Sequence, residues 1–216
     1  MGVKRLGVLG GTFDPVHYGH LVAAQEVGWS LRLDRVLFVP AARSPHKLTA
    51  EVSPVQHRVA MIEIAIADNP LFALSTVDVD RPGPSYTVDT LAILKQAYGE
   101  DVELFFIVGM DALAELPSWR EPERVLSLAR LVGVTRPPFP TVDLGSLAAR
   151  LPGSEGRIDL VAMPGLDISA SDLRLRVAQG RPIRYLLPPG VEAYIARHGL
   201  YRSSASASTI SPTATR

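Results

Sequence analysis

The sequence predicts one α/β domain, built on a parallel sheet with helices on both faces. Two observations lead to this fold class. Short apolar runs alternate along the chain with longer segments of helical periodicity, which is typical of parallel sheets covered by helices on both sides. The chain also has 216 residues, 47% of them hydrophobic, enough to bury one sizeable core. We expect a single domain over residues 1–202 and a disordered tail over residues 203–216, where small polar side chains leave almost no apolar anchor.

Each element follows from its own pattern. Six short apolar runs are expected to form strands, at residues 6–9, 36–39, 72–77, 104–108, 131–134 and 160–162. Seven segments have helical periodicity, at residues 19–31, 54–67, 87–97, 121–128, 144–150, 171–178 and 189–197. Ser53 and Pro54 are suited to cap and begin the second helix. Gly180 and Gly199 stand just past two helical segments, where glycine commonly ends a helix.

Composition narrows the class of protein. The 22 basic and 22 acidic residues balance, so no net field favours nucleic acid or a membrane surface as a partner. No apolar run reaches the length of about 18 residues that spans a membrane, and no secretory signal pattern precedes the first strand. The sequence contains no cysteine, which excludes disulfides and thiolate metal sites. We therefore expect a cytoplasmic protein with no nucleic-acid and no membrane partner.

The segment GGTFDPVHYGH, residues 10–20, is the most informative part of the chain. It follows the first strand directly, at the carboxyl end where parallel sheets bind ligands. Gly10 and Gly11 lack a Cβ, so the backbone can turn sharply and a phosphate group can approach it closely. A helix that begins near Tyr18 offers unpaired N–H groups and a positive dipole end. His17 and His20 are three residues apart and project from one face at this end, placed to donate hydrogen bonds to phosphoryl oxygens.

Other interpretations of these residues stay open from the sequence alone. Histidines at this spacing can also bind a metal ion, with Asp14 as the one obvious further ligand nearby. They can also be structural, and the two glycines can form an ordinary tight turn.

The same segment resembles the H/T-x-G-H signature of the nucleotidyltransferase superfamily and, within it, is similar to the bacterial nicotinate mononucleotide adenylyltransferases. Further matching motifs follow in the same order: SPHK (residues 44–47), SYTVDTL (85–91), FIVGMDAL (106–113), LPSW (116–119) and ISASDLR (168–174). With the first segment they span nearly the whole chain, about residues 5–201. The resemblance implies a Rossmann-like α/β fold and the transfer of AMP from ATP to nicotinate mononucleotide, which gives deamido-NAD and pyrophosphate in NAD biosynthesis.

The resemblance also assigns site residues. His17 and His20 are implied to be catalytic, as donors that stabilise charge on the transferring phosphoryl group. The residues implied to bind ATP are Gly10, Thr12, Phe13, Gly109, Asp111, Ser171 and Arg174. Those implied to bind nicotinate mononucleotide are Gly11, His46, Lys47, Thr87 and Trp119. No dedicated protein site for a metal is implied; Mg²⁺ is expected as a cofactor carried with ATP.

Several of these residues have a structural alternative. Asp111 is implied to accept hydrogen bonds from the adenosine ribose hydroxyls, but it can also cap a helix. Trp119 is implied to stack on the pyridine ring, and its alternative is the core. Thr87 begins a helix whose backbone N–H groups are implied to face the pyridine carboxylate, and its hydroxyl can also cap that helix. Lys47 suits a phosphate, or is simply exposed to solvent.

The motif ISASDLR departs from the commoner family pattern, which has Ser and Thr where this chain has Ala170 and Ser171. Ser171 keeps a hydroxyl at the helix start for phosphate contact, whereas Ala170 supplies none. Arg174, one turn further on, is implied to hold the β- and γ-phosphates, with solvent exposure as its alternative.

Other functions share part of this pattern. Phosphopantetheine adenylyltransferases have the same chemistry but lack the SYTVDTL and LPSW elements, and a class I tRNA synthetase fragment would need a KMSKS-like loop and a much longer chain. A nucleotide-sensing protein would keep the cavity without turnover, and the intact His17, His20 and Arg174 argue against it. The absence of GxxxxGK[ST] argues against a P-loop kinase or NTPase. The expected partners are ATP and nicotinate mononucleotide; the oligomeric state is left open, with a homodimer as one option.

Overall fold

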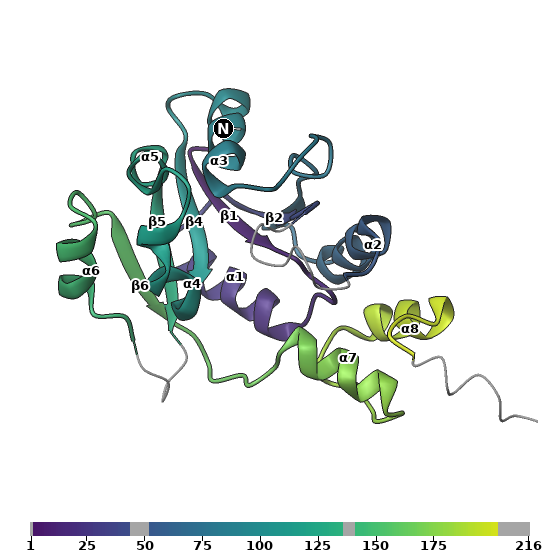
Figure 1. The fold of residues 1–216 in the computed structure, drawn as a ribbon. Coiled ribbons are helices and arrows are strands. Elements are labelled where there is room, and N and C mark those ends of the chain that lie inside the picture. Colours follow the sequence, from purple (N-terminus) through teal and green to yellow (C-terminus); the bar gives the residue numbers. More distant parts are fainter. Residues whose placement is uncertain (1, 44–51, 136–140, 203–216) are drawn as a thin grey trace, which may run out of the picture.

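The computed structural model describes residues 2–43, 52–135 and 141–202 of the chain (Figure 1). Within these ranges six strands form one sheet: β1 (Arg5–Gly11), β2 (Arg35–Pro40), β3 (Phe72–Leu74), β4 (Glu103–Gly109), β5 (Ala129–Thr135) and β6 (Ile158–Ala162). Their order across the sheet is β3-β2-β1-β4-β5-β6, and every neighbouring pair is parallel. The strand order therefore reverses between β1 and β4, the place where sheets of this kind bind ligands. The predicted fold class is confirmed.

Helices cover both faces of the sheet (Figure 1). The buried apolar cluster on one side includes residues of α1 (Tyr18–Ser30), α2 (Val55–Ile66), α7 (Ala170–Ala178) and α8 (Pro189–His198). The cluster on the other side includes residues of α3 (Thr87–Tyr98), α4 (Met110–Ala114), α5 (Pro122–Leu128), α6 (Leu144–Arg150) and the short 3-10 helix η2 (Leu116–Ser118). Successive strand residues alternate between the two clusters, as Phe105 and Phe106 do on β4. Because both faces are buried, the strands are continuous apolar runs, which is why the sequence locates them.

All six predicted strands are present, but β3 ends at Leu74 rather than at residue 77. A turn stops it there. The Thr76 hydroxyl donates to Asp80 Oδ2 at 2.6 Å, and the backbone N–H groups of Val79 and Asp80 donate to the carbonyl oxygen of Thr76. Short polar side chains compete in this way with strand pairing, so the apolar pattern overstates the length of the strand.

Local details at the helix ends differ from expectation in part. Ser53 does not cap α2: Pro54 occupies the cap position, and the backbone N–H of Ser53 donates to Asp14 Oδ2 at 3.1 Å. The sequence also does not predict α4 or η2, because elements of five and three residues leave no readable periodicity. Gly180 and Gly199 have φ angles of 68° and 62°, the left-handed conformation expected just past a helix end.

The described part of the chain ends at Arg202, shortly after α8. The predicted tail over residues 203–216 lies outside the described residues, so the boundary at residue 202 stays a prediction. In the described ranges, no helix is both long and apolar enough to cross a membrane.

Candidate active site

A cavity of about 1110 Å³ opens at the carboxyl ends of β1 and β4. Residues from the starts of α1, α3 and α7 line it, and helix N-termini favour anionic ligands. Ten of the predicted site residues line this cavity: Gly10, Gly11, Thr12, His17, His20, Thr87, Gly109, Asp111, Trp119 and Ser171. Segments that are far apart in the sequence thus meet around one cavity, because the carboxyl ends of parallel strands lie at one edge of the sheet.

Two further predicted residues, Phe13 and Arg174, are described and do not line the cavity. The side chain of Phe13 is buried in the core, and Arg174 lies behind Ser171 on α7. His46 and Lys47 lie outside the described residues.

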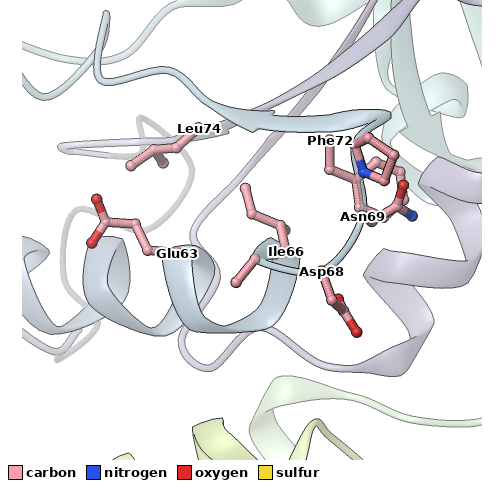
Figure 2. Close-up of a pocket in the computed structure, with 8 residues that line it drawn as sticks. Glu63, Ile66, Asp68, Asn69, Phe72 and Leu74 are labelled. Atoms are coloured by element: carbon pink, nitrogen blue, oxygen red, sulfur yellow. The ribbon is translucent and has the colours of Figure 1, made fainter.

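A second hollow, of about 550 Å³, lies at the edge of the sheet between α2 and β3 (Figure 2). It is lined by Glu63, Ile66, Ala67, Asp68, Asn69, Pro70, Phe72 and Leu74. The charged side chains among these lining residues are the two carboxylates, which would repel phosphate groups. The candidate active site is therefore the larger cavity.

The two histidines stand together at the start of α1. Their rings are stacked, with centroids 3.8 Å apart and planes 30° apart. His17 is the cap residue, and its backbone N–H donates to Nδ1 of His20 at 3.2 Å. Because Nδ1 of His20 accepts this bond, a neutral His20 ring keeps its proton on Nε2 and can donate from there. We call this part of the cavity, with His17, His20 and Ser171, the histidine end.

Gly19 leaves the space that the His17 ring occupies. A Cβ on Gly19 would lie 3.0 Å from both Cε1 and Nδ1 of His17, closer than ordinary side-chain packing allows. The position of the first ring therefore favours glycine between the two histidines, since a Cβ there would displace the ring. This gives the HxGH pattern a steric reason within this chain.

The prediction that Gly10 and Gly11 form the sharp turn is wrong. Both residues belong to β1, and the left-handed residue that turns the chain is Phe13, with φ of 51°. The two glycines instead make room for aromatic rings: a Cβ on Gly10 would lie 3.2 Å from the Phe106 ring, and one on Gly11 would lie 3.2 Å from the Phe13 ring. The Phe13 ring packs edge-on against the His20 ring, with centroids 5.0 Å apart, and so helps to hold the His20 ring in place.

A buried arginine holds the segment between β1 and α1 to its neighbours. Arg58 on α2 is only 2% exposed, and its guanidinium donates to the carbonyl oxygens of Ser53, Thr12 and Ala41 at 2.8–3.0 Å. Burial lowers the pKa of Arg58, and the nearby Asp14 carboxylate opposes that shift. The arginine thus ties the end of β1 to the end of β2 through backbone groups.

Asp14 is engaged in structural contacts rather than directed at a ligand. Its Oδ1 accepts the Tyr201 hydroxyl at 2.6 Å and its Oδ2 accepts the backbone N–H of Ser53 at 3.1 Å. These bonds occupy the carboxylate that the metal-pair interpretation needs as a third ligand. Among the described residues, no group of three His, Cys, Asp or Glu is arranged to hold a metal ion.

The start of α7 is capped two residues before the predicted phosphate contact, Ser171. Ser169 is the cap, and its Oγ accepts the backbone N–H of Asp172 at 3.1 Å. Ser171 is the second helical residue and lines the cavity. Arg174 donates from Nη1 to the carbonyl oxygen of Asp14 at 2.7 Å and from Nη2 to the Ser171 hydroxyl at 3.3 Å. Arg174 is therefore anchored at the histidine end and is not simply solvated.

The end of β4 supplies an open edge of the cavity. Gly109 is the cap of α4, and a Cβ on it would meet no atom within 4 Å. Asp111 is exposed in the first turn of α4, so the alternative that Asp111 caps this helix is wrong. Both residues line the cavity, which leaves the Asp111 carboxylate accessible to a ligand.

The opposite side of the cavity, with Thr87, Trp119 and Arg120, is called here the α3 end. Thr87 is the first residue of α3 and Tyr86 is its cap; no side-chain hydrogen bond caps the helix, so the hydroxyl-cap alternative for Thr87 is wrong. Trp119 is half-buried and packs edge-on against Phe106, with centroids 6.0 Å apart, while it also lines the cavity. Trp119 thus belongs to the edge of the core and to the cavity wall at once.

Arg120 adds a positive charge at the α3 end. Its guanidinium lies over the Tyr86 ring, 4.7 Å from the centroid, immediately before the first residue of α3. Arg120 lines the cavity, whereas its neighbour Arg124 is not among the lining residues. Both arginines also contact Glu121, at 3.7 Å and 3.1 Å.

An ion pair between the buried Asp78 and the partly buried Arg81 supports the same end. Asp78 accepts the Thr90 hydroxyl at 2.6 Å and the Arg81 Nε–H at 3.1 Å. Arg81 in turn donates to the carbonyl oxygen of Pro84 at 2.9 Å. The turn that ends β3 therefore fixes the chain that enters α3, and Asp78 and Thr90 themselves line the cavity.

Sequence reasoning misses four residues of this arrangement: Arg58, Asp78, Tyr201 and Arg120. One signal was available for Arg58, which falls on the same helical stripe as the buried Met61, Ile62 and Ala65 of α2. An arginine on an apolar stripe needs polar partners, and here they are backbone carbonyl groups. No local pattern marks Tyr201, because its partner Asp14 is 187 residues away in the sequence.

The chain is similar to known proteins over most of its length. The profile of the cytidylyltransferase-like family matches residues 8–176. A probable nicotinate-nucleotide adenylyltransferase from Thermomicrobium roseum is 52% identical over 201 residues, which cover 93% of each chain. Another from a Roseiflexus species is 54% identical over 202 residues, which cover 94% of this chain and 100% of the relative.

Solved structures share the architecture. The nicotinic acid mononucleotide adenylyltransferase of Plasmodium falciparum, in a complex with NaAD, matches with a TM-score of 0.76 and 21% identity. The match covers 92% of this chain and 97% of that one. At this level of identity the likeness shows the fold.

Proposed function

The chain belongs to the nicotinate-nucleotide adenylyltransferases, within the cytidylyltransferase-like family, and we propose that it transfers AMP from ATP to nicotinate mononucleotide, releasing pyrophosphate and giving deamido-NAD. The observation that carries this proposal is the cavity itself. It combines two stacked histidines at a helix start with a helix start and a tryptophan on the opposite side. One end thus suits a reacting phosphate, and the other suits an aromatic ring that bears an anion.

His17 and His20 are proposed to act on the transferring phosphoryl group. An oxygen of the mononucleotide phosphate attacks the α-phosphorus of ATP, and the bond to the departing pyrophosphate breaks as the new P–O bond forms. No covalent enzyme intermediate is needed, so the protein's part is to position the reactants and stabilise charge. The Nε2–H of His20 and the start of α1 supply donors for that charge. One such donor is typically worth about 10²–10³ in rate.

The proposed ATP contacts lie on the rim formed by β1, β4 and α7. We infer that the Gly10, Thr12 and Gly109 backbone faces the nucleotide and that Asp111 accepts the ribose hydroxyls. Ser171 and Arg174 are proposed to hold the β- and γ-phosphates. A guanidinium has five N–H donors, so Arg174 can keep its bond to Asp14 while it donates to a phosphate. Phe13 contributes through its backbone only, because its ring is buried.

The proposed contacts of nicotinate mononucleotide lie at the α3 end. Backbone N–H groups at the start of α3, around Thr87, suit the pyridine carboxylate, and Trp119 is proposed to stack on the ring. Arg120 places a further positive charge at this end. Gly11, His46 and Lys47 are proposed for the ribose and phosphate of the same substrate.

Nucleotidyltransferases typically need a divalent metal, and we propose that Mg²⁺ is carried here with ATP. Mg²⁺ prefers oxygen ligands and keeps several waters, and the described part of the chain has no three-residue acidic or histidine cluster that would replace them. When bound, the ion would neutralise charge on the triphosphate and on departing pyrophosphate. Arg174 and Ser171 would then orient the outer phosphates against it.

The test is turnover with each mononucleotide. The full chain is incubated with ATP, Mg²⁺ and nicotinate mononucleotide, and both pyrophosphate and deamido-NAD are measured. Nicotinamide mononucleotide carries a neutral amide whose NH₂ finds no acceptor at a helix start, so its kcat/KM should be lower on the order of 10²-fold. No pyrophosphate from either substrate would refute the proposed function. Equal kcat/KM for the acid and the amide would refute the carboxylate site while adenylyl transfer stood.

A further inference from the structure

Asp14 joins four parts of the chain that are distant in the sequence. It lies three residues before His17 and is 3% exposed. Its carboxylate accepts the hydroxyl of Tyr201 and the backbone N–H of Ser53, and its carbonyl oxygen accepts Arg174. These bonds connect the segment before the histidines to the start of α2, to α7 and to the residues after α8.

Tyr201 is built into this position. It follows the helix-ending Gly199 and itself has a φ of 63°, an uncommon left-handed conformation for a residue with a side chain. That backbone directs the hydroxyl inward, 2.6 Å from Asp14 Oδ1. Burial and the bond to Asp14 raise the pKa of Tyr201 far above its ordinary value, so the phenol keeps its proton and donates.

The segment that Asp14 belongs to needs such support. Phe13 has a φ of 51°, a left-handed conformation that is unfavourable for a residue with a side chain. Such a conformation is kept only where several surrounding contacts hold the backbone in it. Arg58 fixes the carbonyl of Thr12 on one side of Phe13, and Asp14 is fixed on the other. Together these contacts set the direction in which the chain enters α1, and with it the position of the His17 ring.

We propose that Tyr201 is a positioning residue for the reaction, which acts through its hydrogen bond to Asp14 and holds residues 12–17 so that His17 and His20 stay aligned on the transferring phosphate. This assignment rests on the proposed function for its kinetic consequence. It also makes the described end of the chain, beyond α8, part of the machinery that shapes the active site. The contact crosses 187 residues of sequence.

The test compares two tyrosine hydroxyls of the same region. Tyr201→Phe removes the bond to Asp14. Tyr194→Phe on α8 removes a 2.9 Å bond to His57 Nδ1, and the Tyr194 ring packs against His57 and His198. Misplacement of reacting groups by about 1 Å can lower rates on the order of 10²-fold. We expect Tyr201→Phe to lower kcat roughly tenfold with KM for ATP and the mononucleotide within about threefold of wild type. Tyr194→Phe should leave kcat unchanged.

Two further measurements separate positioning from stability. Thermal unfolding of both variants identifies any loss of folded protein, and kcat is compared at a temperature where both are folded. Asp14→Ala, which removes both acceptor oxygens, should lower kcat at least as far, and adding Tyr201→Phe to it should lower kcat little further. Full additivity of the two changes, or an unchanged kcat in folded Tyr201→Phe, would overturn the assignment.

A readout without substrate distinguishes this inference from the proposed function. Amide hydrogen exchange of residues 12–17 should be faster in Tyr201→Phe than in Tyr194→Phe or in the wild type. If the wild type released no pyrophosphate, the proposed function would fail while exchange still tested the contact. If exchange over residues 12–17 were the same in all three proteins, the positioning role would be refuted even in an active enzyme.

Discussion

The two ends of the cavity are held in place by different interactions. At the histidine end, the supporting charges of Asp14 and Arg58 are buried, and Asp14 receives the Tyr201 hydroxyl from the far end of the chain. At the α3 end, the supporting pair is Asp78 and Arg81, whose hydrogen-bond partners lie within residues 78–90. One end is therefore assembled from distant segments, whereas the other is a largely local structure.

This difference indicates what each end does for the reaction. Removing one partner from a buried, hydrogen-bonded charge is strongly disruptive, so changes at the histidine end should disturb geometry and lower kcat. Contacts at the α3 end are partly exposed to solvent, where charges contribute little individually. Changes there should alter the binding and choice of the mononucleotide, which is seen in KM.

The largest effect is expected at the histidine end, from His20→Ala. Loss of the proposed Nε2–H donor should lower kcat about 10²-fold or more while the protein stays folded. Pyrophosphate release with ATP, Mg²⁺ and nicotinate mononucleotide measures it. The matched control is His198→Ala, an exposed histidine at the end of α8 that does not line the cavity. A near-wild-type kcat for His20→Ala would remove the catalytic assignment, and rescue by added Zn²⁺ would favour a metal pair.

At the α3 end, Trp119→Ala should act on binding. Loss of stacking on the pyridine ring should raise KM on the order of tenfold for both the acid and the amide substrate, since stacking is blind to the ring's substituent. The other tryptophan, Trp29, is 79% exposed and does not line the cavity, so Trp29→Ala is the control. An unchanged KM in folded Trp119→Ala would assign this side chain to the core alone, where it contacts Phe106.

A smaller and more selective effect is expected from Arg120→Gln. Its side chain is 53% exposed, and an exposed charge contributes up to about 1 kcal/mol, or roughly fivefold. We expect that loss in kcat/KM for nicotinate mononucleotide and almost none for the amide. Arg124→Gln is closely matched, with 56% side-chain exposure and the same partner Glu121, but without a place in the cavity. Equal losses for both substrates would mean that Arg120 does not act on the carboxylate.

The same contrast explains what the sequence predicts of this molecule. The fold was accessible because the strands are buried on both sides and leave uninterrupted apolar runs. Every predicted strand exists. Five of them extend one or two residues beyond the predicted bounds at one or both ends, and β3 alone is shorter than predicted, because Thr76 and Asp80 form a polar turn that apolar patterning does not register. The sequence does not predict short elements such as α4, because five residues are too few to show a helical periodicity of apolar positions.

The sequence predicts the residues that line the cavity better than the buried residues that hold them in place. Residues such as His20, Thr87 and Trp119 lie in local motifs, and the parallel sheet brings those motifs to one edge. The helical stripe marks Arg58 as buried but does not identify the carbonyl groups that it binds. Tyr201 contacts a residue 187 positions away, so no spacing in the sequence reveals its role. The turn was misplaced onto Gly10 and Gly11 because glycine is the default residue for such a turn, whereas tertiary contacts here hold Phe13 in that conformation.

The smallest effect is expected from deleting residues 203–216, and it tests where the support of the histidine end stops. This segment, SSASASTISPTATR, has too little apolar content to pack, so its removal should leave Tm and kcat unchanged. Ending the chain two residues earlier, after Leu200, also removes Tyr201 and should lower kcat at least as far as Tyr201→Phe does. The two truncations differ only in Tyr201 and Arg202, so a difference between them belongs to those residues. A fall of several degrees in Tm on removing residues 203–216 alone would show instead that the segment packs against the domain, and the boundary at residue 202 would have to move.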